Sequence, residues 1–303
     1  MHAAYAKWPN DRPIELIVGF AAGGGQDIMA RTLAPFIEKQ LNARLVVMNR
    51  GGAGGEIAYG AVARAAPDGY TLGIVSTPGI VAIPIQRKAQ FDSTTLIPVA
   101  RIVDDPTAVV VIIDSKFDSL KNYIDRARAT PGSVSSGYNS IGTNGHIGSA
   151  LLEQAAGVRF NGIPYQGTGQ SRPALLGGHV DSVFMGLGEF LEAGRDGKSR
   201  FRLLGYMAAE SFKVAGDAPT FREIGLDLVF SSERGVAAPR GLPAAVNTRL
   251  AQAIERAIAD PAFVEAARKQ SLLLSYLPEP EWAKQMDRLL PRLTEVVKAM
   301  PTK

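Results

Sequence analysis

The sequence contains no cysteine and only three histidines, His2, His146 and His179. The lack of cysteine excludes disulfide bonds, thiolate catalysis and cysteine-ligated metals. The histidines are scattered along the chain, and none forms the i, i+4 pair that is typical of a helical metal site. We therefore expect no metal ion and no other cofactor.

Long hydrophobic runs and a strong excess of charge are also lacking. The longest apolar run, residues 108–113, is far shorter than the roughly 20 residues that span a bilayer. Lysines and arginines number 33 against 29 acidic residues, and they are dispersed, so we expect no nucleic-acid partner. The segment from Met1 to Pro9 has no apolar signal-peptide region, so we interpret any export signal as already removed.

What is present is a strand pattern, a glycine turn and a helix pattern in succession between residues 14 and 41. Glycines stand at positions 23, 24 and 25, and apolar residues at helical spacing begin near Gln26. Glycines let backbone N–H groups converge, and a helix N-terminus adds unpaired donors and the positive end of its dipole. Two interpretations stay open here, a cradle for a carboxylate or phosphate and a tight connection without a ligand.

Two later loops repeat this arrangement. A strand pattern at residues 133–137 precedes the polar loop 138–145 and a helix at 146–156, and the loop 164–169 follows an apolar pattern at 158–163. Open α/β sheets bind their ligands at the carboxyl ends of strands, where these loops would lie. The sequence therefore predicts two walls of one cleft.

Motifs of α/β enzymes are incomplete. The run Gly197-Lys198-Ser199 resembles the end of a phosphate-binding loop, but Glu192 stands where that motif needs its first glycine. No G-x-S-x-G nucleophile motif occurs. An enzyme that acts on a small anionic or phosphorylated substrate is an alternative, but no complete catalytic or phosphate-binding motif in the sequence supports it.

Strand and helix patterns alternate along the 303 residues, which suits two α/β domains. Residues 14–76 indicate a βαβαβ unit with parallel strands. A turn at 105–107 leads into a strand at 108–113, and a second crossing is expected at 228–232. We predict a first domain from residues 1–105 and 228–303, and a second from 106–227.

Six segments carry a resemblance to a known family: residues 20–27, 49–55, 67–72, 164–167, 175–181 and 238–243. In this order and spacing the chain resembles the solute-binding receptors of tripartite tricarboxylate transporters, the Bug-type family, from about Trp8 to Lys303. The resemblance implies a periplasmic-binding-protein fold of the Venus flytrap kind, type II, with two hinge crossings. It also implies a periplasmic, monomeric receptor that delivers a small organic acid to a membrane permease.

On this basis we expect the ligand to contact both predicted walls. Asp27 has an alternative role in complementing the helix dipole, and Arg234 can either meet a second carboxylate or pair with Glu233 or a solvent-facing neighbour. The expected ligand-binding residues are Phe20, Ala22, Gly24, Gln26, Asp27, Thr77, Asn139, Ser140, Gly142, Thr143, Asn144, Tyr165 and Arg234.

The expected function is binding of a small carboxylate, either a dicarboxylate or an aromatic acid, without chemistry. Many members of the family carry an acidic residue after the position of Phe184, where this chain has Met185 and Gly186, so we expect no amino-acid ligand. A sensor that binds the same ligand and reports to a kinase is a third alternative, which the sequence does not separate from transport.

Overall fold

The computed structural model describes residues 8–92, 94–195, 197 and 199–300. Residues 1–7, which hold most of the segment behind the prediction about export, lie outside this part. The chain divides into two compact α/β units. Unit 1 consists of the chain up to Asp104 together with Glu233–Thr294, and unit 2 consists of Asp105–Ser232 and the end of the chain from Glu295.

The strands of unit 1 are built around β1, which pairs in parallel with β2 on one side and β3 on the other. This confirms the predicted parallel βαβαβ unit. β9 runs antiparallel to β3, β4 follows β9 in the sheet, and β10 pairs antiparallel with β4. The bounds are β1 Ile14–Val18, β2 Leu45–Asn49, β3 Thr71–Ser76, β4 Leu96–Ile112, β9 Ser231–Pro239 and β10 Leu274–Pro278.

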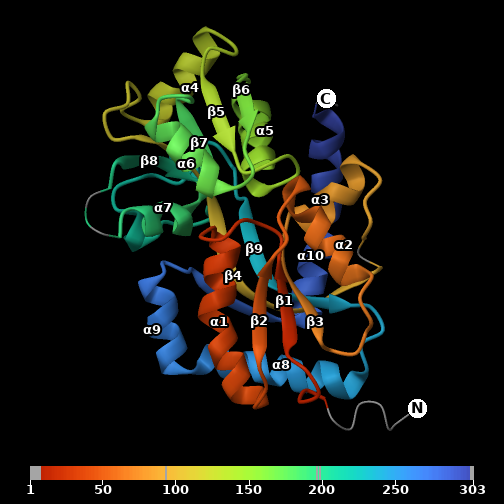
Figure 1. The fold of residues 1–303 in the computed structure, drawn as a ribbon. Coiled ribbons are helices and arrows are strands. Elements are labelled where there is room, and N and C mark those ends of the chain that lie inside the picture. The colour runs from red at the N-terminus through yellow and green to blue at the C-terminus, as the bar shows by residue number, and fades with distance from the viewer. Residues whose placement is uncertain (1–7, 93, 196, 198, 301–303) are drawn as a thin grey trace. The chain divides into compact units, whose positions relative to one another are not determined.

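Side chains on alternate positions of these strands enter two separate cores. Leu16 and Val18 of β1 pack with α1, α8 and α9, which lie beside one another in Figure 1, whereas Ile17 packs with α2, α3 and α10. Both faces of the sheet are therefore covered by helices, as a parallel sheet requires. The helices are α1 Gly25–Leu41, α2 Glu56–Ala63, α3 Gly79–Gln86, α8 Ala244–Ala259, α9 Pro261–Lys269 and α10 Glu279–Ala299, with a 3₁₀ turn at Ala53–Gly55.

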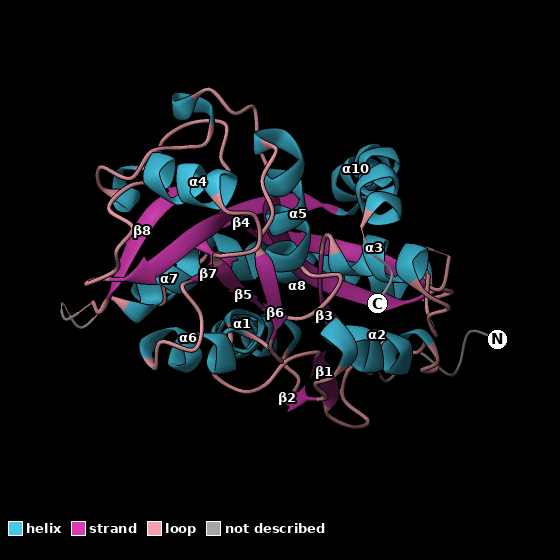
Figure 2. Cartoon of the chain, turned by 90° about the horizontal axis from the view of Figure 1, so that it is seen from above, coloured by secondary structure: helices cyan, strands magenta, loops and turns pink. Residues whose placement is uncertain are grey.

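In unit 2 the strand order is β4, β7, β5, β6, and β8 pairs with β4. β5 is parallel to β6 and β7, whereas β7 and β8 run antiparallel to β4. Figure 2 shows the helices (cyan) beside these strands (magenta). The bounds are β5 Ser135–Tyr138, β6 Asn161–Pro164, β7 Ser182–Gly186, β8 Phe201–Tyr206, α4 Leu120–Ala129, α5 Asn144–Ala156, α6 Thr168–Leu176 and α7 Leu187–Ala193, with 3₁₀ turns at Lys213–Ala215 and Arg222–Ile224.

The predicted strand at 108–113 was too short, because β4 begins at Leu96 and runs through the segment that we expected to turn. Within it the Asp104 N–H donates to the Leu273 carbonyl, and the Thr107 N–H to that of Phe230. Backbone hydrogen bonds to partners distant in sequence thus hold this stretch in a strand, although its Asp and Pro residues favour a turn locally. Residues 228–232, where a second crossing was expected, only partly belong to a strand: β9 begins at Ser231 and buries Glu233 and Arg234.

Candidate functional site

The first predicted cradle, residues 20–27, follows β1 and ends in the first turn of α1. The Ile28 N–H donates to the Gly24 carbonyl at 2.9 Å, which starts the helical pattern. Within the described part of the chain, the structure gives no protein acceptor to the N–H groups of Gly25, Gln26 and Asp27. Three donors at the positive end of α1 therefore remain for an anion.

The Asp27 carboxylate organises this cradle. It accepts from the Gly23 N–H at 2.9 Å, from Arg31 Nε at 2.9 Å and from Asn49 Nδ2 at 2.8 Å. Burial raises its pKa, but the donors from Arg31, Gly23 and Asn49 outweigh burial and hold the pKa below its usual value. Both oxygens thus have partners within the protein, and Asn49 Nδ2 also donates to the Phe20 carbonyl at 3.0 Å.

Behind the cradle, Gln26, Tyr59 and Ser76 form a buried polar cluster. Gln26 Nε2 donates to Tyr59 Oη at 3.3 Å and to Ser76 Oγ at 3.1 Å, so both of its protons are used. The two hydroxyls lie 3.3 Å apart. The Gln26 Oε1 atom is buried, and none of the described residues donates a hydrogen bond to it. Gln26, in the first turn of α1, therefore carries an acceptor that no described residue satisfies.

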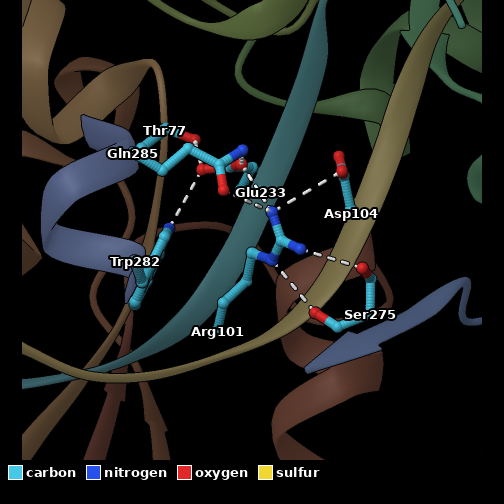
Figure 3. A network of polar contacts seen from close by, with 7 residues as sticks. All are labelled: Thr77, Arg101, Asp104, Glu233, Ser275, Trp282 and Gln285. Atoms are coloured by element: carbon cyan, nitrogen blue, oxygen red, sulfur yellow. Dashed lines mark hydrogen bonds and ion pairs between the residues drawn. The ribbon is translucent and has the colours of Figure 1, made fainter. Parts of the chain in front are cut away.

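Thr77 follows β3 and is fixed to β9 at two points. Its N–H donates to the Glu233 carbonyl, and its hydroxyl donates to Glu233 Oε2, both at 3.0 Å. Figure 3 shows that the Glu233 carboxylate also faces Arg101, Trp282 and Gln285. Thr77 is thus positioned by a network that reaches from β4 to α10.

The Glu233 carboxylate is buried and receives four donors. Arg101 Nη1 lies 2.7 Å from Oε1 and Trp282 Nε1 lies 3.0 Å from Oε2, while Gln285 Nε2 donates to Oε1. Burial raises the pKa of Glu233, and the Arg101 guanidinium opposes that rise. The sequence analysis missed this network, because Glu233 was interpreted only as a neighbour of Arg234.

Arg234 lies on β9 opposite Ser76 of β3 and is 4% exposed. Successive side chains of a strand point to opposite faces, so Glu233 and Arg234 point away from each other. The Arg234 charge acts on Tyr59: burial raises the pKa of Tyr59, and hydrogen bonds with Ser76 and Gln26 and the Arg234 charge oppose it.

The second cradle, residues 139–146 of unit 2, follows β5 and leads into α5. Asn139 Oδ1 accepts from the Thr143 hydroxyl at 2.8 Å, and Asn139 Nδ2 donates to Asn144 Oδ1 at 3.1 Å. Ser140 and Gly142 have φ values of +87° and +81°. Ser140 is an uncommon residue for that conformation. The Thr143 hydroxyl lies 2.7 Å from the Ser140 carbonyl, so its single proton is shared between that carbonyl and Asn139 Oδ1.

Backbone donors are available here as well. The Ile147 N–H donates to the Thr143 carbonyl, and the structure gives the N–H groups of Thr143 and Asn144 no protein acceptor among the described residues. The Gly142 N–H donates to His146 Nδ1 at 3.2 Å, which fits a structural role for that ring. Tyr165, after β6, is half-buried and attached through its N–H to the Tyr138 carbonyl.

The predicted ligand residues therefore form two groups. The unit 1 group comes mainly from the segment between β1 and the first turn of α1, which holds Phe20, the exposed Ala22, Gly24, Gln26 and Asp27. Thr77 directly follows β3, and Arg234 lies on the neighbouring strand β9. The unit 2 group comprises Asn139, Ser140, Gly142, Thr143, Asn144 and, one strand along, Tyr165. Tyr59 and Ser76 were missed; in the sequence they look like ordinary core and strand residues. That one ligand contacts both groups stays a prediction.

Residues 29–300 match the model of a family described as "Tripartite tricarboxylate transporter family receptor". The chain belongs to this family. It is 34% identical over 263 residues to Protein BugT of Bordetella pertussis, which covers 86% of this chain and 80% of BugT. The resemblance found in the sequence is thereby confirmed, and the receptor is a periplasmic-type solute-binding protein and not an enzyme.

Solved structures of similar proteins carry ligands. The Rhodopseudomonas palustris protein Rpa4515 with adipate has a TM-score of 0.88 and 26% identity, and the match covers 96% of this receptor and 97% of that chain. MatC (Rpa3494) from the same species, with bound malate, has a TM-score of 0.85 and 26% identity, covering 95% and 99%. These matches confirm the predicted periplasmic-binding-protein fold.

No group of three or more metal-binding side chains occurs in the part of the receptor that the structure describes, and no helix there is long and apolar enough to cross a membrane. The expectation against an amino-acid ligand relied on the missing acid at Met185 and Gly186. A side chain at Gly186 would meet Asp105, whose Cγ lies 2.6 Å from the position of a Cβ there, so β4 supplies a carboxylate beside this position.

Proposed function

We propose that this receptor captures a small organic carboxylate, a dicarboxylate or an aromatic acid, and delivers it in the periplasm to the membrane permease of a tripartite tricarboxylate-type transporter. The observation that carries the proposal is the presence, in each unit, of a helix N-terminus whose first N–H groups have no acceptor among the residues that the structure describes. The donors belong to Gly25, Gln26 and Asp27 in unit 1 and to Thr143 and Asn144 in unit 2.

Such donors suit carboxylates. Each hydrogen bond from an N–H group to a charged acceptor contributes about 1.5 to 3 kcal/mol, and a helix N-terminus favours the negative charge further. The ligands adipate and malate of two similar proteins are both dicarboxylates. We propose that both cradles bind one ligand, and that Arg234 meets a second carboxylate.

A thermal-shift screen tests the proposal. The receptor is heated at fixed pH with aliphatic mono- and dicarboxylates, aromatic acids, amino acids and nucleotides. A ligand present at 100 times its Kd stabilises the folded protein by about 2.7 kcal/mol. We expect dicarboxylates or aromatic acids to raise Tm most. Stabilisation by amino acids or nucleotides alone would contradict the proposed ligand class.

Arg234→Ala tests the second contact. If Arg234 binds a distal carboxylate, the variant should weaken a dicarboxylate by about 1.5 to 3 kcal/mol more than its monoacid analogue, measured by isothermal titration calorimetry. Arg268→Ala removes the same charge from an exposed pair with Glu265 on α9 and should change neither affinity. Equal weakening of both acids by Arg234→Ala would show that Arg234 is structural.

A further inference from the structure

We infer that Asn49 is a positioning residue for the first cradle: its side-chain amide, oriented by Arg31, fixes the loop 20–23 in the conformation that leads into the first turn of α1. This inference rests on the proposed function, because it gives Asn49 a part in anion binding at that turn. Asn49 is not among the residues that the sequence analysis expects to contact the ligand.

Asn49 lies where β2 ends beside the end of β1. In the parallel pair of these strands (Figure 1), Asn49 is the partner of Val18, the last residue of β1. The Arg50 N–H donates to the Val18 carbonyl at 2.8 Å and closes the pair. The chain leaves β1 after this point, so the side chain of Asn49 reaches the loop that follows the strand.

The amide of Asn49 uses both of its protons and its oxygen. Nδ2 donates to the Phe20 carbonyl at 3.0 Å and to Asp27 Oδ1 at 2.8 Å, and Oδ1 accepts from Arg31 Nη2 at 2.9 Å. A reversed amide would place its oxygen against a carbonyl and a carboxylate, neither of which can donate. The three partners therefore determine the orientation of the Asn49 side chain.

This network holds the loop at both of its ends. Asn49 donates to the carbonyl of Phe20 at the start of the loop, and Asp27 accepts from the Gly23 N–H at 2.9 Å at the end. Asn49 and Asp27 also hydrogen-bond each other, so the positions of the two ends are coupled.

The conformation of the loop matters for binding because α1 begins directly after it. The N-cap residue Gly24 has no side chain that could cap the helix. Inside the loop the Gly24 N–H donates to the Ala21 carbonyl at 3.3 Å, near the upper limit for a hydrogen bond, so Asn49 and Asp27 supply the shorter contacts. A loop that is already fixed in one conformation has little ordering cost when an anion binds at its end.

Asn49 is exposed, so its replacement should leave the core intact. Asn49→Ala removes the amide. Asn49→Asp keeps its shape and its acceptor for Arg31, but a second oxygen then faces the Asp27 carboxylate in place of the NH2 group. If the donated protons fix the loop, Asn49→Asp should weaken binding at least as much as Asn49→Ala does. If Asn49 acts by packing alone, Asn49→Asp should bind like the parent.

Isothermal titration calorimetry of the full receptor with malate, adipate and benzoate, each as a separate probe, measures the effect on binding. We expect both variants to raise the Kd of every probe that binds the parent by about fivefold or more. An unchanged Kd in Asn49→Ala, or a weakening confined to Asn49→Ala, would overturn the inference while the proposed function stands.

Arg128→Ala is the matched control. Arg128 is an exposed residue of unit 2 that donates, as Asn49 does, to a backbone carbonyl, that of Ala156, at 3.2 Å. Its removal should leave the Kd of each probe unchanged. A similar rise of Kd in Arg128→Ala would show that the effect is not specific to the first cradle and would also overturn the inference.

Amide exchange measured by NMR on the receptor alone gives a second readout. The Gly23 N–H should exchange about fivefold faster or more in Asn49→Ala than in the parent, because its acceptor Asp27 loses the contact with Asn49. Unchanged exchange would overturn the inference even where a probe binds. If no probe binds the parent, the proposed ligand classes are wrong, and the exchange of the Gly23 N–H still decides whether Asn49 fixes the loop. Circular dichroism checks that each variant is folded.

Discussion

Charged residues in unit 1 are buried only where several donors or acceptors converge on them. Glu233 and Arg101 are 1% and 5% exposed, and Arg101 also donates to the carbonyl and hydroxyl of Ser275 at 3.0 and 2.9 Å. Removing one partner of a buried pair commonly costs about 3 to 5 kcal/mol, because the other charge is left uncompensated. The Thr77 hydroxyl donates to Glu233, so its orientation depends on an ion pair whose disruption strongly destabilises the protein.

A glycine in the second cradle gives a matched test of close ligand approach. Gly142 and the exposed turn residue Gly197 have φ values of +81° and +71°, so alanine at either position should cost about 1 to 2 kcal/mol of stability through the same backbone strain. We expect Gly142→Ala to weaken ligand binding and Gly197→Ala to leave it unchanged, as measured by calorimetry. Equal affinities in both variants would place the ligand away from this cradle.

Asp27 gives a pH-dependent prediction. Its pKa is lower in the folded protein than the ordinary value of 3.8, so its contribution to stability is complete above 3.8 and is lost as pH falls through the folded value. Asp27→Asn should lower the free energy of unfolding by about 1.5 to 3 kcal/mol at pH 7, the contribution of hydrogen bonds to a charged group, because the buried Asp27 carboxylate accepts three of them. In urea titrations this difference should shrink toward pH 3. A constant difference across that range would show that the charge of Asp27 is not responsible.

At the scale of elements, the close approach of β9 to β4 depends on Gly235. A Cβ there would collide with the Ala100 carbonyl oxygen and would lie 2.6 Å from the Trp282 ring. Gly235→Ala should therefore destabilise the protein by about 3 kcal/mol, since neither backbone nor a fully buried Trp can yield. The control Gly51→Ala meets only ordinary contacts at 3.6 Å or more and should be close to neutral in urea titrations. A mild effect of Gly235→Ala would mean that β4 and β9 can separate at this point.

The sequence predicted those elements whose glycine and apolar patterns lie within a short stretch of the chain. The sequence analysis found the strand, glycine turn and helix around Gly24 and also the second cradle. In each case the glycine spacing and the apolar periodicity that indicate the elements fall within about 25 residues of the chain. The length of β4 was missed because its backbone partners Leu273 and Phe230 are distant in sequence. The role of Glu233 was missed because its donors Thr77 and Trp282 are distant as well. The groups to which Thr77 and Gln26 donate their protons are also distant in sequence, so no local sequence pattern predicts these hydrogen bonds.

At the scale of the whole molecule, the proposal that both cradles hold one ligand predicts where amide exchange slows. Hydrogen exchange with saturating ligand should protect the N–H groups of Gly25–Asp27 in unit 1 and of Thr143 and Asn144 in unit 2, because these donors gain an acceptor. The exposed α9 helix serves as an internal control. Protection confined to one cradle would show that a single unit binds the ligand.

The division of unit 1 between two stretches of sequence has a consequence for the order in which the chain can fold. Strands β1 to β3 are synthesised first with α1 to α3, yet most of β9 and the helices α8 to α10 that complete the two cores come only after residues 105–232 of unit 2. Unit 2 is almost entirely one continuous stretch and can assemble its own core as it emerges from the ribosome. Until then α1, α2 and α3 cover the early strands only in part, so a growing chain keeps apolar surface exposed and is a client for chaperones until Trp282 on α10 completes the second core.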